Sequence, residues 1–189
     1  IASGPELTNI STLDFMGDNT DNFFNDIFFD PIEKRYYVSF NDGRILEYDQ
    51  NGILRSSIIT TSGRRPFKLY VDENYIYAEE RSYDNQNTLL VVYYKISGAL
   101  YQSSTIDFDV VGMHKIADEL IIIANEGNNG LVARYYLQTN GLSIEDEEFD
   151  LINTSLYDDF YSTDESILIA TDSQVIFLNI ETQYLWSGV

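Results

Sequence analysis

The residues of this chain that could do chemistry are mainly oxygen donors, and they recur directly after short apolar segments. They lie in four polar stretches, at 41–44, 79–87, 125–130 and 171–174. The carboxylates and carboxamides at the start of these stretches are Asn41, Asp42, Glu79, Glu80, Asn125, Glu126 and Asp172. Oxygen ligands of this kind bind Ca²⁺ and also hydrogen-bond to sugars. Hairpin turns favour the same residue types, so the sequence leaves both interpretations open and assigns no metal.

Two further features bear on chemistry. Arg64 and Arg65, near Lys68, form a basic cluster in an acidic chain, and they could bind an acidic group or form local ion pairs. His114 is the only histidine, which argues against a histidine-based zinc site and against a Ser-His-Asp triad combined with a metal site. We expect His114 to lie in the core or in a channel, and the sequence assigns no catalytic residue.

Composition limits the classes of partner. The chain has 189 residues, of which 44% are hydrophobic and 14% aromatic, as expected for a folded globular domain. Its formal net charge of −20 repels nucleic-acid phosphates and anionic membrane surfaces. No apolar run exceeds the length of a strand, so we expect no membrane insertion. The absence of cysteine excludes disulfides, thiolate metal sites and a cysteine nucleophile.

The elements that must position these residues are set by an internal repeat. The same seven-residue phrase occurs at Asp72–Ala78, Asp118–Ala124 and Asp164–Ala170, with starts 46 residues apart, and a looser copy begins at Asp30. We expect the recurring aspartate to bind the backbone of its own turn. A small residue also recurs at one position of the phrase, where we expect a close approach of the next repeat. In the four copies this residue is Ser39, Ala78, Ala124 and Ala170.

Each repeat divides into four short strands separated by turn residues. Asn51-Gly52, Ser97-Gly98 and Asn140-Gly141 have the chemistry of tight hairpins, so we expect consecutive strands to pair antiparallel. The repeats span about 23–60, 66–108, 110–150 and 155–189, within a single domain over 1–189. In the second repeat, the second strand is expected at 75–78. Residues 6–15 match the end of a later repeat and are expected to form an additional outer strand.

Four-stranded repeats of this length and turn placement resemble the blades of a β-propeller. The first repeat, from Asp26 to Gly52, is loosely similar to NHL-type and other six-bladed repeats. The fold class we expect is all-β: a radial array of about four four-stranded antiparallel blades. A closed ring of four, completed by the N-terminal strand, and a partial or truncated propeller both fit the sequence, and we favour the partial propeller.

Two functions fit this frame. The first is a non-catalytic binding or scaffolding propeller that recognises a protein or glycan partner in the cell envelope or the extracellular space. The second follows from a resemblance to metal-dependent lactonases, which hold Ca²⁺ in the central channel through Glu, Asn and Asp. We favour the first, without an enzymatic activity and without a required cofactor, because a catalytic channel draws on all blades of a ring.

Overall fold

The computed structural model describes residues 23–61, 63–116, 119–138, 141–144, 156–163, 166–171, 174–179 and 184–188. At 138, 141–144, 158 and 184–188 it describes the backbone alone. Within these ranges the regular elements are strands, β1 to β16. Over the same residues, no helix is long and apolar enough to cross a membrane.

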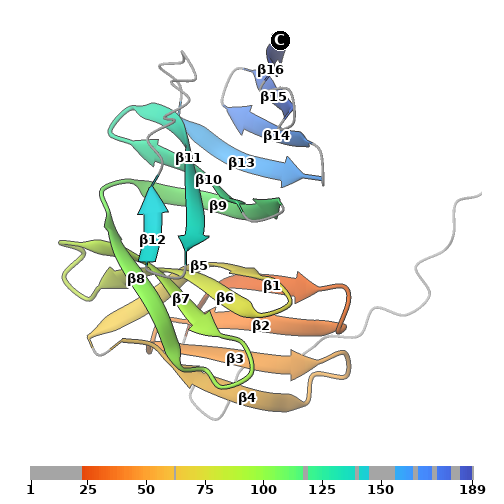
Figure 1. Cartoon of the computed structure of the whole chain (residues 1–189), viewed down its shortest axis with the longest axis vertical. Coiled ribbons are helices and arrows are strands. Elements are labelled where there is room, and N and C mark those ends of the chain that lie inside the picture. Colours follow the sequence, from red (N-terminus) through yellow and green to blue (C-terminus); the bar gives the residue numbers. More distant parts are fainter. Residues whose placement is uncertain are drawn as a thin grey trace, which may run out of the picture.

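The strands form four sheets of four, each in chain order and antiparallel (Figure 1). The first sheet contains β1 (Phe24–Asp30), β2 (Arg35–Phe40), β3 (Arg44–Asp49) and β4 (Leu54–Ile59). The second contains β5 (Arg64–Val71), β6 (Tyr75–Ser82), β7 (Thr88–Tyr94) and β8 (Leu100–Ile106). The third contains β9 (Asp109–Ile116), β10 (Glu119–Glu126), β11 (Asn129–Gln138) and β12 (Gly141–Ile144). The fourth contains β13 (Tyr157–Ser162), β14 (Ser166–Thr171), β15 (Val175–Asn179) and β16 (Tyr184–Gly188). The predicted strand content and pairing are confirmed.

Glycine and aspartate make the turns as their chemistry predicts. Gly52 and Gly98 have φ angles of 76° and 65°, which side chains with a Cβ rarely adopt. Asp30 Oδ1 accepts hydrogen bonds from the amides of Ile32 and Glu33, at 2.9 and 3.1 Å. The equivalent Asp72 binds the amides two and three residues ahead, at 2.8 and 2.7 Å. The turn role of the recurring aspartate is therefore confirmed at these two positions, whereas 118 and 164 lie outside the described residues.

The sheets pack one after another through their first strands. β5 packs against β1 and β2, β9 against β5, and β13 against β9, so the first and fourth sheets lie at the two ends of the array (Figure 1). Alternation along β6 shows how one sheet serves two junctions: Ile76 and Ala78 pack in the core shared with the first sheet, and Tyr77 in the core shared with the third. The second sheet is thus covered on both faces.

Each first strand carries a β-bulge at the recurring small residue. The register of β1, β5, β9 and β13 shifts beside Ser39, Ala78, Ala124 and Ala170, whose partners are Asp26, Leu69, Val110 and Asp159. Ser39, Ala78 and Ala124 are fully buried. Ser39 Oγ donates to the carbonyl oxygen of Phe67 on the second sheet, at 3.1 Å. The equivalent register positions of the four small residues are confirmed. The close approach of the next sheet is seen at Ser39, whereas Ala78 packs toward the first sheet and Ala170 is half-buried. The expected outer strand at 6–15 lies outside the described residues.

Candidate functional site

Two of the expected loop carboxylates belong to a strand. The prediction that the second strand of this repeat ends at Ala78 was wrong, because β6 continues to Ser82. Glu79 pairs with Leu90 and Glu80 with Leu89, so pairing with β7 extends the strand through polar residues. Both glutamates are 0% exposed.

Glu79 lies at the junction between the second and third sheets. Its Oε1 accepts a hydrogen bond from Arg81 Nε at 2.7 Å, and Arg81 also approaches Asp109 of β9 at 3.3 Å. Burial raises the pKa of Glu79 to about 7, although the neighbouring Arg81 favours the charged form. Its second oxygen has no hydrogen-bond partner in the described part of the chain. Glu79 is therefore a buried junction group that titrates near neutral pH.

Glu80 lies on the opposite face of β6, toward the first sheet. It accepts a hydrogen bond from the hydroxyl of Tyr93, which in turn accepts one from the amide of Thr61 at 3.2 Å. Burial raises the pKa of Glu80, and the hydrogen bond from Tyr93 partly opposes this effect. The two successive glutamates thus serve two different junctions and do not face a common centre.

The other expected oxygen donors have separate roles. Asn125 joins the third sheet to the fourth, because its amide nitrogen donates to the carbonyl of Tyr157 at 2.9 Å and its oxygen accepts from the amide of Tyr157 at 2.8 Å. Asp42 pairs with Arg44 at 2.6 Å on the surface. Glu126 is exposed, and residue 172 lies outside the described residues. No group of three or more His, Asp or Glu side chains suited to a metal occurs among the residues described.

Of the two arginines of the basic cluster, Arg64 binds within the second sheet and Arg65 links the first two sheets. Arg64 donates to the carbonyl of Glu80 at 3.0 Å and also contacts Asn87. Arg65 donates to Asn41 Oδ1 at 3.1 Å and to Asn85 Oδ1 at 2.8 Å.

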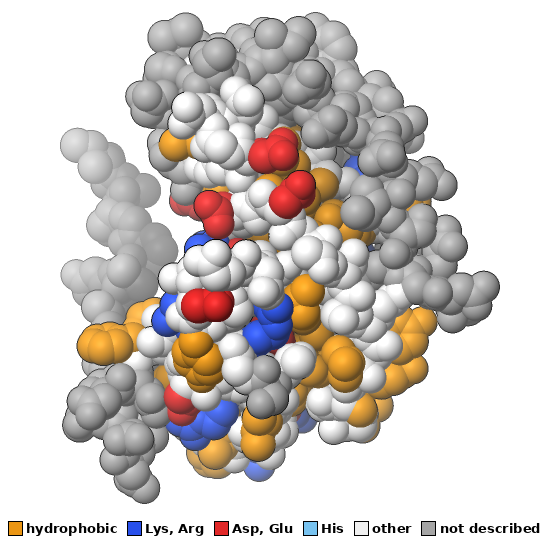
Figure 2. Space-filling model, turned by 90° about the vertical axis from the view of Figure 1, so that its left-hand side faces the viewer, with side chains coloured by type: hydrophobic (Ala, Val, Ile, Leu, Met, Phe, Trp, Pro, Cys, Tyr) orange, Lys and Arg blue, Asp and Glu red, His pale blue; other side chains and the backbone are white. Residues whose placement is uncertain are grey.

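Aromatic rings flank the guanidinium group of Arg65. Arg65 lies 5.4 Å from the ring centroid of Phe67 and 5.8 Å from that of Tyr83, whose side chain is 53% exposed. We call Asn41, Arg65, Tyr83 and Asn85 the Arg65 surface. Figure 2 shows one face of the molecule, on which acidic, basic and hydrophobic side chains are interspersed.

A hollow of about 260 Å³ lies where the first strands of all four sheets face one another. It is lined by residues 26–28, 68–70, 111–114, 159, 160 and 162. His114, expected in the core or in a channel, thus lines this hollow. Among its charged groups, Asp26 accepts a hydrogen bond from the amide of Leu69 at 2.9 Å, and burial raises the pKa of Asp26. Sequence reasoning did not identify Asp26, Lys68 or Asp159 as site residues. The bulges that place them leave no signal in residue type or spacing.

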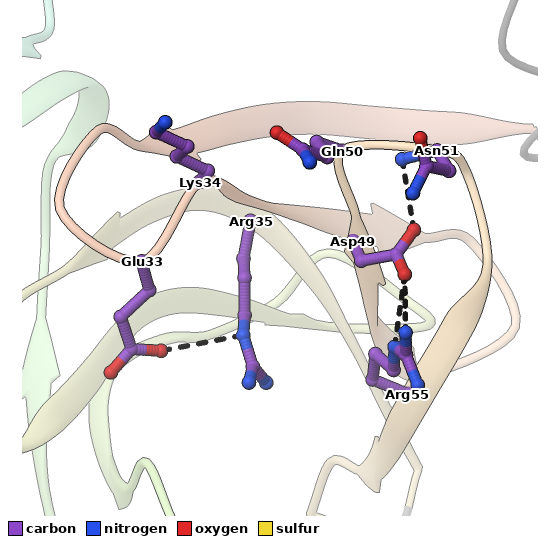
Figure 3. Close-up of a pocket in the computed structure, with 7 residues that line it drawn as sticks. All are labelled: Glu33, Lys34, Arg35, Asp49, Gln50, Asn51 and Arg55. Atoms are coloured by element: carbon purple, nitrogen blue, oxygen red, sulfur yellow. Dashed lines mark hydrogen bonds and ion pairs between the residues drawn. The ribbon is translucent and has the colours of Figure 1, made fainter.

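A second hollow, of about 380 Å³, lies at the edge of the first sheet between the β1–β2 and β3–β4 turns (Figure 3). Asp49 binds Arg55 at 2.5 Å and accepts a hydrogen bond from the amide of Asn51 at 2.9 Å. Arg35 lies 3.5 Å from Glu33 and also pairs with Glu47. Both arginines that line this hollow, Arg35 and Arg55, are thus neutralised by nearby carboxylates. The hollow is therefore a weaker candidate for a binding site.

Comparisons with known proteins identify the fold. No family model and no curated sequence matches the chain. Among solved structures, U3-55K is 12% identical with a TM-score of 0.64, covering 97% of this chain and 56% of that one. The RRP9 WD40 repeats are 10% identical with a TM-score of 0.63, covering 89% and 52%. BamB from Moraxella catarrhalis is 11% identical with a TM-score of 0.59, covering 88% and 50%.

These similarities concern the fold alone, because the identities are low. The chain spans about half the length of these three solved structures. Together with the four antiparallel sheets, they show a β-propeller-type repeat protein whose blade-like sheets form an open array. The expected fold class and the resemblance to propellers are confirmed, and no specific family is shown.

Proposed function

We propose that this β-propeller-type protein is a non-catalytic scaffold that binds a protein partner through the Arg65 surface. The observation that carries the proposal is the order of Arg65, which is held between two sheets by Asn41 and Asn85 and flanked by aromatic rings. Arginine and tyrosine are the residue types enriched in interface hot spots. A side chain that is already ordered loses little conformational entropy on binding.

The proposal favours binding over catalysis because the oxygen donors expected to act in the channel have other roles. Glu79 and Glu80 are buried at two different junctions, and Asn125 binds backbone groups. The formal charge of −20 argues against a nucleic-acid partner and favours a partner with complementary basic groups around a central aromatic contact.

Site-specific photo-crosslinking tests the proposal. A photoreactive phenylalanine analogue replaces Tyr83 in the full chain, and the crosslinked proteins are identified in the cells from which it comes. The matched control places the analogue at Tyr94, a 42% exposed tyrosine at the opposite end of the same sheet. We expect a crosslinked protein at 83 that is absent at 94. Identical products at both positions, or no product at 83, would contradict the proposal.

Affinity measurements with the identified partner give the energetic test. Tyr83→Ala should weaken binding about tenfold, the effect of losing about 1.4 kcal/mol, because an exposed aromatic anchor is removed. Tyr94→Ala should leave the affinity unchanged. A glycan array probed with the same two variants tests the glycan alternative, which requires a glycan signal that Tyr83→Ala abolishes.

The setting we propose is the cell envelope or the extracellular space. The support is indirect: the chain has no cysteine that oxidation could alter, and its high negative charge favours solubility. Fractionation of source cells with an antibody to the protein tests this setting, and recovery in the cytosolic fraction would contradict it.

A further inference from the structure

The hollow between the first strands contains an arc of aromatic rings. The ring centroids of Phe28 and Tyr70 are 5.1 Å apart in an edge-on arrangement, and those of Tyr70 and His114 are 5.8 Å apart in the same arrangement. These three rings come from β1, β5 and β9, and all three residues line the hollow. Three successive sheets therefore build one aromatic wall.

Charged groups accompany this wall. Asp26 precedes Phe28 by two residues in a regular part of β1, so its side chain lies on the same side of the strand as the ring. Lys68 lies within the irregular part of β5 and lines the hollow together with Tyr70. Lys68 interacts electrostatically with Asp26. Asp159 lines the hollow from β13, where its Oδ1 accepts a hydrogen bond from the amide of Phe160 at 2.8 Å. Lys68 offsets one of the two carboxylates, which leaves Asp159 as the excess charge.

Bulges in the first strands support a binding role. Asp26, Lys68 and Asp159 lie at the register shifts of β1, β5 and β13. A bulge redirects side chains and is common beside functional sites. At these three positions the strand pairing is irregular, and the side chains of Asp26, Lys68 and Asp159 line the hollow.

We propose that this hollow binds a protonated amine on an apolar or aromatic stem. The ammonium group pairs with Asp159. The apolar stem packs against the rings of Phe28 and Tyr70, and the ring faces also attract the nearby positive charge. The excess carboxylate and the formal charge of −20 favour a cation over an anion. An organic cation is preferred to a metal ion, because the described residues form no group of three metal ligands. A volume of about 260 Å³ fits a small amine or a single side chain.

Two sources share this chemistry: a free small amine, and a lysine side chain of a bound protein. The site is separate from the Arg65 surface, so the two proposals fail independently. Tyr83→Ala, which removes the aromatic part of that surface, should leave amine binding unchanged.

Titration with two matched probes tests the proposal. Phenethylamine is the cationic probe and phenylacetate the anionic one, and each is added to the full chain at constant pH and ionic strength. The ring signals of His114, the only histidine, report occupancy in an NMR spectrum. We expect saturable shifts with phenethylamine and none with phenylacetate. Absence of saturable binding by phenethylamine, or equal binding of both probes, would overturn the proposal.

Variants locate the ammonium group. Asp159→Asn keeps the hydrogen bond to the amide of Phe160 and removes the charge, so it should weaken phenethylamine binding about tenfold. Asp42→Asn is the matched control, since Asp42 lies on the surface beside Arg44 and outside the hollow. Asp159→Ser, which also removes the charge, provides a second variant in case the first fails to fold. Unchanged binding in the folded hollow variants would overturn the assignment.

Peptides distinguish the two sources. An acetylated, amidated peptide with one lysine is compared with the same peptide carrying glutamine. Lysine-dependent peptide binding that Asp159→Asn weakens identifies a protein side chain as the occupant. Binding of the free amine alone identifies a small molecule. Binding that ignores both the lysine and Asp159 would contradict the proposal.

Discussion

Lys95 Nζ lies 2.8 Å from Asp30 Oδ2, and this ion pair joins the second sheet to the first. The two side chains are 6% and 7% exposed. The same aspartate that shapes its own turn thus also fixes the neighbouring sheet. At the next junction, the equivalent Asp72 binds Lys115 of β9 at 2.5 Å, so the device recurs with a lysine from a different strand.

Breaking the first pair should destabilise the fold. Lys95→Met leaves a buried carboxylate without its charge partner, which should reduce the free energy of unfolding by about 3 kcal/mol. Arg44→Met is the control, because its pair with Asp42 is on the surface and should cost less than about 1 kcal/mol. Urea denaturation of both variants measures the difference. An equal loss of unfolding free energy in the two variants would show that the buried pair contributes no more to stability than the surface pair.

The pair should also give an acid-sensitive contribution to stability. Burial alone would raise the pKa of Asp30, but Lys95 and two backbone amides outweigh it and leave the pKa lowered. The folded state therefore stabilises the carboxylate, and this contribution is lost as the pH falls below the unfolded value near 3.8 through the folded pKa. Unfolding measured from pH 6 downward should show a smaller acid dependence in Asp30→Asn. An identical acid dependence would contradict the pairing.

Glu79 should act in the opposite direction. Its pKa is raised from 4.5 to about 7, so its folded state favours the proton. Stability from this group is present below pH 4.5 and is lost as the pH rises to 7. As the pH rises from 4.5 to 7, the free energy of unfolding of Glu79→Gln should therefore increase relative to that of the wild type by up to about 3 kcal/mol. Denaturation curves at several pH values test this, and a constant difference between the two proteins would refute it.

The third and fourth sheets should not tolerate a methyl group at Gly112. A Cβ there would lie 1.7 Å from a ring carbon of Phe160, so Gly112→Ala forces the ring aside and should cost about 1 to 3 kcal/mol. Adding Phe160→Leu should recover part of the loss in the double variant. If Gly112→Ala unfolds at the same temperature as the wild type, the described packing is incorrect.

Calcium should leave the melting temperature unchanged. Among the expected donors that the structure describes, Glu79 and Glu80 are buried, and Asn125 is bound to Tyr157. The exposed Glu126 therefore lacks these three as shared ligands of a cation. A ligand stabilises a protein only in proportion to its binding of the folded state, so millimolar calcium should have no effect beyond that of magnesium. A calcium-specific increase that Glu126→Gln abolishes would instead favour the lactonase-like alternative.

The sequence predicts the fold well because its strongest signals are local. The recurring Asp and the Gly turns encode the hairpins of each sheet, through bonds and φ angles within a few residues. The site is predicted less well, because it depends on contacts between sheets. Glu79 and Glu80 follow Ala78 as polar residues typically follow a strand, and only pairing with β7 and packing of two neighbouring sheets place them inside. Likewise, Asp159 enters the hollow through a bulge that its neighbours in the chain do not encode.

The most direct test of the radial arrangement is an NMR measurement of proton contacts between the rings of Phe28, Tyr70 and His114. These residues belong to three different sheets, and their rings meet only if the first strands surround one hollow. We predict nuclear Overhauser contacts from the His114 ring to Tyr70 and from Tyr70 to Phe28. Contacts of His114 confined to its own sheet, with none to Tyr70, would contradict the arrangement and the binding site built on it.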